Sequence, residues 1–136
     1  MVIVTIFGVV IWWLRRKKTL VARAWEREGR VFLRRPVGIN FSGLESQGMG
    51  QIRGNGFMAL TDQDLRITRA APAAEWRYLH RDIKGVGLEA SFLGKRRGRM
   101  KVLVITFEQD GQLDRIGVYA RNSTAWVEAI SQVVEG

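Results

Sequence analysis

The residues of this chain best suited to chemistry are five cations clustered between Gly94 and the apolar run that follows. The cluster consists of Lys95, Arg96, Arg97, Arg99 and Lys101. No acidic residue occurs within residues 91–101, so nothing close in sequence neutralises these charges. Lys binds a phosphate as a point charge, whereas Arg binds it through a planar fork of donors. The cluster therefore predicts contact with an anionic partner, either anionic lipid or a membrane protein.

Two other interpretations of this cluster remain open. A cation-rich hairpin tip also keeps a protein soluble without binding any ligand. A nucleic acid is the second polyanion that it can bind, with the arginines on phosphates and Tyr119 or Trp76 stacked on bases. We expect nucleic acid least of the three, because nucleic-acid binding does not require the apolar N-terminus and because the predicted sheet lacks exposed aromatic residues arranged on adjacent strands.

A second run of cations follows directly on fourteen uncharged residues, Met1 to Leu14. It reads Arg15-Arg16-Lys17-Lys18. Cations stay at the headgroups while apolar side chains enter hydrocarbon, and tryptophans such as Trp12 and Trp13 favour the interface. Residues 1–18 are therefore expected to form a single-pass membrane anchor and its basic junction. The positive charges predict an N-terminus outside the cell and a cytoplasmic domain, and topology alone accounts for them.

The length of the apolar run is the difficulty with an anchor. Fourteen helical residues cover about 21 Å, whereas a spanning helix needs about 20 residues. Snorkelling, local thinning of the bilayer, or a start upstream of Met1 would make up the difference. A secretory leader and a buried or surface-lying helix are the alternatives. Ala22-Arg23-Ala24 imitates a cleavage site, but no cation precedes the apolar run and four follow it.

Groups suited to catalysis are sparse. The only histidine, His80, is expected to be structural, because alternation places it beside Trp76 and Tyr78. Asp62 and Asp64 suit a tight turn. The chain has no cysteine and shows no metal-ligand spacing, P-loop or pairing of nucleophile and base. We therefore expect no enzyme activity, catalytic residue, metal or cofactor.

The chain has 136 residues and a net charge of +9, so a single domain of about 100 residues remains after the anchor. Residues 19–29 are expected to form a juxtamembrane helix that ends near Gly29. The folded domain is expected to span residues 30–136. A basic protein of this kind should meet anionic partners, either the headgroups of membrane lipids or nucleic acid.

Alternating apolar residues and turn signals predict an antiparallel β domain. A first strand is expected at 30–35, ended by Pro36, and the Gly-rich stretch at 38–56 is expected to form turns. Leu65 and Ile67 should face the core, with Arg66 on the opposite face. Turns are expected at 95–98 and at Asp110-Gly111. The other predicted strands are 57–60, 65–68, 75–80, 83–92, 101–108 and 115–121.

An amphipathic helix is expected to close the domain. Asn122 or Ser123 can cap it, and its apolar positions include Trp126 and Ile130 at helical spacing. A half-barrel of strands exposes apolar side chains at its open end. We expect Trp126 to plug that end.

Two segments and the last helix carry a resemblance to a known family. The segment from Met58 to Ile67 resembles the "LTD-x-x-L" hairpin of bacterial pleckstrin-homology-like and GRAM-like domains. Residues 79–86 resemble the following strand of that family, and Trp126 is similar to the tryptophan of its closing helix. The resemblance covers roughly residues 50–135. It implies a mainly β, pleckstrin-homology-like barrel with a closing C-terminal helix, used without catalysis to dock lipid or protein.

Overall fold

The computed structural model describes residues 23–25, 27, 31–48, 51, 53–96 and 98–135, with only the backbone of residues 95, 96 and 135. The strands of the main sheet are β1 (Phe32–Leu44), β2 (Gly54–Thr61), β3 (Asp64–Arg69), β4 (Ala74–Leu79), β5 (Ile83–Glu89), β8 (Val102–Gln109) and β9 (Gln112–Ala120). The remaining elements are β6 (Ser91–Phe92), β7 (Lys95–Arg96), the 3-10 turns η1 (Glu45–Gln47) and η2 (His80–Asp82), and the helix α2 (Ser123–Glu135).

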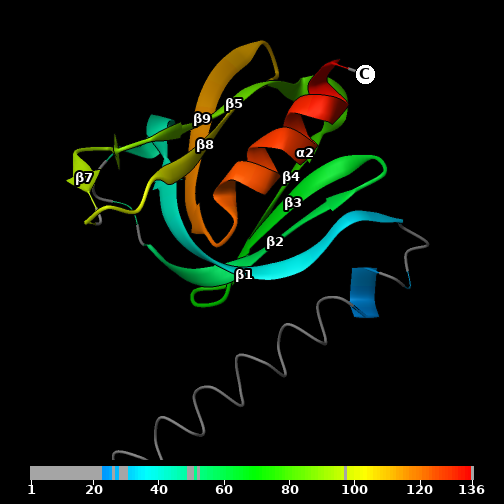
Figure 1. The fold of residues 1–136 in the computed structure, drawn as a ribbon, viewed down its shortest axis with the longest axis horizontal. Coiled ribbons are helices and arrows are strands. Elements are labelled where there is room, and N and C mark those ends of the chain that lie inside the picture. The colour runs from blue at the N-terminus through cyan, green and yellow to red at the C-terminus, as the bar shows by residue number, and fades with distance from the viewer. Residues whose placement is uncertain are drawn as a thin grey trace, which may run out of the picture.

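The seven strands form one antiparallel sheet in the order β4-β3-β2-β1-β9-β8-β5 (Figure 1). The predicted mainly β domain with a closing helix is confirmed. The predicted barrel is wrong, because the sheet is open and β4 and β5 are its two edges. The two edge strands are not paired with each other, so the ladder of hydrogen bonds does not close into a ring.

The sheet nevertheless curls strongly around the core. The ring of Tyr78 on β4 lies 4.0 Å from the ring of Phe107 on β8, and Gln109 donates a hydrogen bond to the carbonyl of Arg77. The helix α2 covers the inner face against β5 and β8. Trp126 and Ile130 are fully buried in the core, as predicted.

Two predicted turns are present. Asp62 and Gln63 join β2 to β3, and the hydroxyl of Thr61 accepts hydrogen bonds from the backbone N–H groups of Gln63 and Asp64. Asp110 and Gly111 join β8 to β9 with φ values of 53° and 75°. Positive φ at both central residues is the geometry of a two-residue hairpin turn whose twist suits the flanking strands.

The first strand was predicted to end at Pro36. In the structure it continues to Leu44. Pro36 lies between Arg34 and Val37, where the pairing of β1 with β2 shifts register. A proline has no backbone N–H to donate, so an irregular step of this kind accommodates it without loss of a regular ladder bond. The long β1 can therefore pair with β2 on one side and with β9 on the other.

The Gly-rich stretch also differs from the prediction of turns throughout residues 38–56. Most of it belongs to β1 and β2, and only residues 45–53 connect the two strands. Gln51 holds this connection, because its side-chain amide bonds both the N–H and the carbonyl of Leu44. The side chain of Gln51 packs against Gly43, whose φ of 139° suits glycine.

Candidate anion-binding site

The basic cluster lies on a small hairpin beside the main sheet. The prediction of a single strand over residues 83–92 is wrong. The strand β5 ends at Glu89, and β6 pairs with β7 in a separate two-stranded sheet. The turn of this hairpin is Leu93-Gly94, with φ values of 55° and 72°, rather than residues 95–98. Lys95 and Arg96 therefore form the returning strand.

The remaining cations of the cluster follow β7. Arg99 and Lys101 are exposed just before β8 begins. Arg97 and the side chains of Lys95 and Arg96 lie outside the described part of the structure. In Figure 1 the hairpin projects from the side of the sheet, so the backbone of β7 is presented away from the core.

One aromatic contact holds this hairpin in place. Phe92, which is 2% exposed, packs on the outer face of β8 and β9 with Val102, Val104 and Tyr119. Its ring lies over Gly117, where a Cβ atom would come within 2.6 Å of Phe92 Cδ1. Glycine inside a strand often marks such a close approach. That signal was present in the sequence, although the partner of Gly117 was not predictable from it.

Arg115 supports the base of the hairpin. Its Nε donates to Glu45 at 2.6 Å, its Nη1 donates to Glu89 at 3.1 Å, and its Cζ lies 5.6 Å from the centre of the Phe92 ring. The hydrogen bond to Glu45 raises the pKa of Arg115, so this guanidinium remains charged. Arg115 thus joins the β1–β2 connection, β5 and the hairpin.

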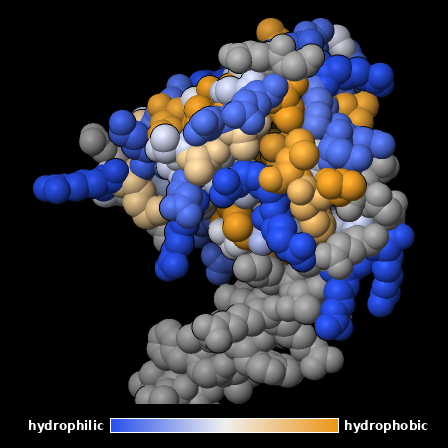
Figure 2. Space-filling model, turned by 45° about the vertical axis from the view of Figure 1, so that its right-hand side comes forward, coloured by the Kyte–Doolittle hydropathy of each residue, from blue (hydrophilic) through white to orange (hydrophobic). Residues whose placement is uncertain are grey.

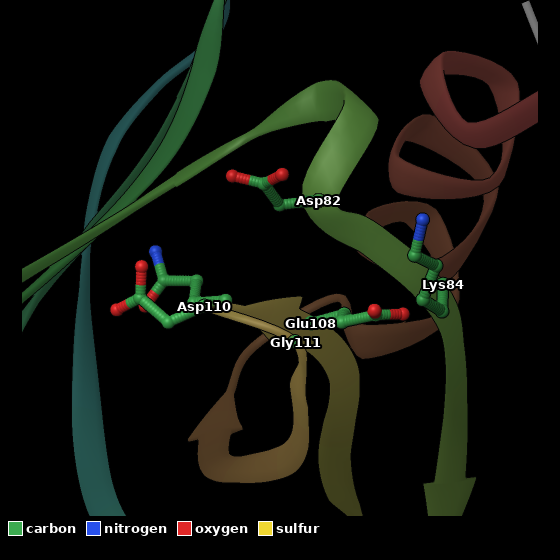
Figure 3. Close-up of a pocket in the computed structure, with 6 residues that line it drawn as sticks. Asp82, Lys84, Glu108, Asp110 and Gly111 are labelled. Carbon is green, nitrogen blue, oxygen red and sulfur yellow. The ribbon is translucent and has the colours of Figure 1, made fainter.

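The opposite end of β8 is acidic. An open cavity of about 490 Å³ lies beside the β8–β9 turn, and Asp82, Glu108 and Asp110 line it together with Lys84 (Figure 3). Lys101 precedes β8 and Asp110 follows it, and a strand of eight residues spans about 26 Å. The domain therefore has a basic pole at the hairpin and an acidic pole at the β8–β9 turn.

The surface carries hydrophobic as well as hydrophilic side chains. In the view of Figure 2, long hydrophilic side chains project from the edges of the domain, and hydrophobic residues lie between them. Val31 and Leu33, at the start of β1, are among the exposed large hydrophobic residues. They follow the predicted juxtamembrane segment directly, and Arg35 lies next to them with its Cζ 5.6 Å from the Phe32 ring.

The predicted anchor at residues 1–18, including Arg15, Arg16, Lys17 and Lys18, lies outside the described residues. Within the described part of the chain, none of the helices has the length and apolar character needed to cross a bilayer. Residues 23–25 and 27 are helical, inside the segment predicted as a juxtamembrane helix.

The sequence did not predict that Arg66 is buried. Arg66 lies on the outer face of β3, as expected, but this face is covered, and the side chain is fully buried. Its Nε donates to Asp64 Oδ1 at 2.9 Å, and Thr61 Oγ1 donates to the same oxygen at 2.6 Å. The ring of Trp25 lies 5.5 Å from Arg66 Cζ. The helical segment before β1 is therefore packed on the outer face of the sheet.

His80, which is expected to be structural, and Tyr78, expected beside it, are both held within the fold. His80 is the first residue of η2, and its Nε2 lies 2.9 Å from the carbonyl oxygen of Thr61 at the end of β2. Burial, together with the charge of Asp114, raises the pKa of Tyr78, so its hydroxyl remains protonated at neutral pH. Among the described residues, no three His, Asp or Glu side chains are placed to hold a metal ion.

These residues define an open antiparallel sheet with an inner helix and a basic hairpin on its outer face. Compared with protein-family models, with curated proteins and with solved structures, the chain shows no match in any of the three.

Proposed function

We propose that this protein is a membrane-anchored, non-enzymatic docking module whose cytoplasmic domain contacts anionic lipid through its basic pole. The observation that carries the proposal is the packing of Phe92 on Gly117. This contact fixes a hairpin that begins a run of five cations, Lys95, Arg96, Arg97, Arg99 and Lys101. The acidic pole lies at the other end of β8, so an anionic surface would attract one end of the domain and repel the other.

The energy of such contact is modest for each residue. A Lys or Arg close to an anionic leaflet contributes about 1 kcal/mol, and the attraction fades within a Debye length of about 8 Å. Five cations suffice only if they face the bilayer. A membrane tether favours that contact, because it holds the domain at an effective concentration on the order of millimolar.

The position of Trp25 supports a short tether. Trp25 packs on Arg66 and lies 6.5 Å from the ring of Phe32, so the chain is fixed to the domain at this point. Six residues lie between Lys18 and Trp25, and the seven Cα–Cα steps from one to the other reach about 25 Å at most when fully extended. The domain would therefore remain within reach of the headgroups that the proposed anchor crosses.

We also propose that the domain belongs to the bacterial pleckstrin-homology-like or GRAM-like class. Seven antiparallel strands with a C-terminal helix bearing the buried Trp126 support this assignment. The open sheet is the feature that departs from the expected barrel. Fold alone does not give the ligand, so the lipid proposal depends on the basic pole.

The proposal can be tested with the full chain in lipid nanodiscs. Because the chain has no cysteine, Ser91→Cys gives one labelling site, exposed on β6 and distinct from the five cations. We expect a fluorophore at Ser91→Cys to be quenched by quencher-bearing lipids in phosphatidylglycerol-containing discs and much less in pure phosphatidylcholine discs. Added salt should reduce the quenching in the anionic discs.

A charge-removal variant completes the test. Replacement of Lys95, Arg96 and Arg97 by Ser should abolish the difference between the two bilayers. Equal quenching in both bilayers for the unmodified cluster would refute the lipid proposal. Displacement of the fluorophore from anionic discs by single-stranded RNA, with a steep salt dependence, would favour a nucleic-acid partner instead.

A further inference from the structure

A groove of about 430 Å³ opens on the outer face of the sheet where β1 runs between β2 and β9. Its volume falls within the range of about 300–1,000 Å³ that small-ligand sites occupy. Gly38 lines the groove, and a Cβ atom at Gly38 would have no neighbour within 4 Å. A missing side chain therefore leaves part of the groove open.

The polar wall of the groove is built by strand register. Asn40 on β1 pairs directly with Asn55 on β2 and with Tyr119 on β9, so the three residues form a row across the strands. Asn40 Nδ2 donates to Asn55 Oδ1 at 3.4 Å, which uses one of the four N–H groups of the two amides. Amides placed side by side offer both donors and acceptors to a hydroxylated ligand.

The charge of the groove favours anions. Arg121 is exposed at the end of β9 and lines it, and Met100 reaches it from between Arg99 and Lys101. None of the described residues that line the groove is acidic. An ammonium group would therefore find no carboxylate partner there, whereas a phosphate would find a guanidinium.

We infer that this groove binds the headgroup of an anionic phospholipid whose headgroup carries hydroxyls and no amine. The phosphate lies at Arg121, the headgroup hydroxyls bond the amides of Asn40 and Asn55, and the glycerol backbone packs on Met100. Phosphatidylglycerol has this chemistry, whereas phosphatidylserine carries an ammonium. The inference rests on the proposed membrane docking and adds headgroup selectivity to it.

The test compares two anionic lipids at equal surface charge. Full-length chain labelled at Ser91→Cys is placed in nanodiscs that contain either phosphatidylglycerol or phosphatidylserine. We expect about a tenfold preference for phosphatidylglycerol in lipid contact, the size that one or two hydrogen bonds to headgroup hydroxyls supply. Equal contact with both lipids would overturn the groove assignment but leave charge-driven docking standing, whereas absence of contact with either would refute both.

Two pairs of variants test whether the preference for phosphatidylglycerol arises at the groove. Gly38→Leu fills the groove, and Gly87→Leu is its control, because a Cβ at Gly87 on β5 also meets nothing within 4 Å. Arg121→Gln removes the cation at the groove, and Arg81→Gln removes an exposed cation near the acidic pole. We expect the first member of each pair to lose the preference and the second to keep it, with thermal unfolding confirming that all four fold. A preference that survives Gly38→Leu would overturn the assignment.

Soluble glycerol phosphate distinguishes the source of the ligand. It carries the same glycerol hydroxyls, with its phosphate as a monoester rather than a diester, but is not concentrated at the bilayer. We expect the preference for phosphatidylglycerol to persist in millimolar glycerol phosphate. Complete loss of the preference would instead assign the groove to soluble phosphate esters and overturn the lipid assignment.

Discussion

The guanidinium carbon of Arg66 lies 5.5 Å from the centre of the Trp25 ring, and both side chains are buried. Trp25 belongs to the helical segment before the domain, whereas Arg66 belongs to β3. A cation placed over an indole face is attracted by the ring, most strongly where water is excluded. This contact makes the segment that precedes β1 part of the folded domain.

Replacing Trp25 with Ala should destabilise the domain by about 3 kcal/mol, as expected for a large buried aromatic side chain. It should also broaden the orientation of the domain and weaken lipid contact at Ser91→Cys. Urea titration of the full chain in nanodiscs measures the first effect. Leu113→Ala is the control, because Leu113 is 67% exposed. Equal stability of the two variants would contradict the packing of Trp25 as a buried side chain.

Replacing Gly117 with Ala should loosen the basic hairpin. The new Cβ would meet the buried Phe92 ring, and overpacking of this kind costs about 1–3 kcal/mol. We expect a spin label at Ser91→Cys to become more mobile, which its electron paramagnetic resonance spectrum would show. The matched change Gly87→Ala, which meets no neighbour, should leave the spectrum unchanged. Identical spectra for both variants would show that Phe92 does not hold the hairpin.

Replacing Gly56 with Ala should be the most damaging glycine substitution in the sheet. A Cβ at Gly56 would lie 1.7 Å from the carbonyl oxygen of Thr68, and this backbone cannot yield without separating β2 from β3. We expect a loss of at least about 3 kcal/mol in the free energy of unfolding. Gly85→Ala serves as the control, since a Cβ there meets nothing within 4 Å. Similar melting temperatures for the two variants would contradict the β2–β3 register.

Asp64 should make stability depend on pH in the acid range. Burial alone would raise the pKa of Asp64, but the hydrogen bonds from Arg66 and Thr61 outweigh it and lower the pKa. A carboxylate with a lowered folded-state pKa adds stability that is present above about pH 4 and is lost as the pH falls through the folded value. Urea titrations across this range should show a smaller loss for Asp64→Asn than for the unmodified chain. Equal losses would show that Asp64 is not the group responsible.

Local patterns in the sequence predicted the parts of the fold that local chemistry determines. Alternation located β2, β3, β4, β8 and β9 and the position of β5, but not β6 or β7. Asp110-Gly111 marked a hairpin turn because these residues tolerate positive φ. The turn at Leu93-Gly94 was missed because Leu93 adopts a φ of 55°, which a leucine side chain rarely allows. The sequence pattern instead predicts the turn at residues 95–98, within the basic cluster.

The remaining differences come from contacts between distant segments. Proline usually ends a strand, and the register shift that admits Pro36 depends on pairing with β2. The burial of Arg66 depends on Trp25, which lies 41 positions earlier in the chain. The groove likewise depends on register, because Asn40, Asn55 and Tyr119 meet only when three strands are aligned. Periodicity within one strand does not encode these relationships.

The most direct test of the central claim determines which pole of the domain meets an anionic bilayer. Fluorophores at Ser91→Cys on the basic hairpin and at Leu113→Cys beside the acidic pole can be compared in the same phosphatidylglycerol-containing nanodiscs. We predict strong quenching by quencher-bearing lipids at Ser91 and little at Leu113, with the difference lost when Lys95, Arg96 and Arg97 are replaced by Ser. Equal quenching at both positions, or stronger quenching at Leu113, would contradict the account.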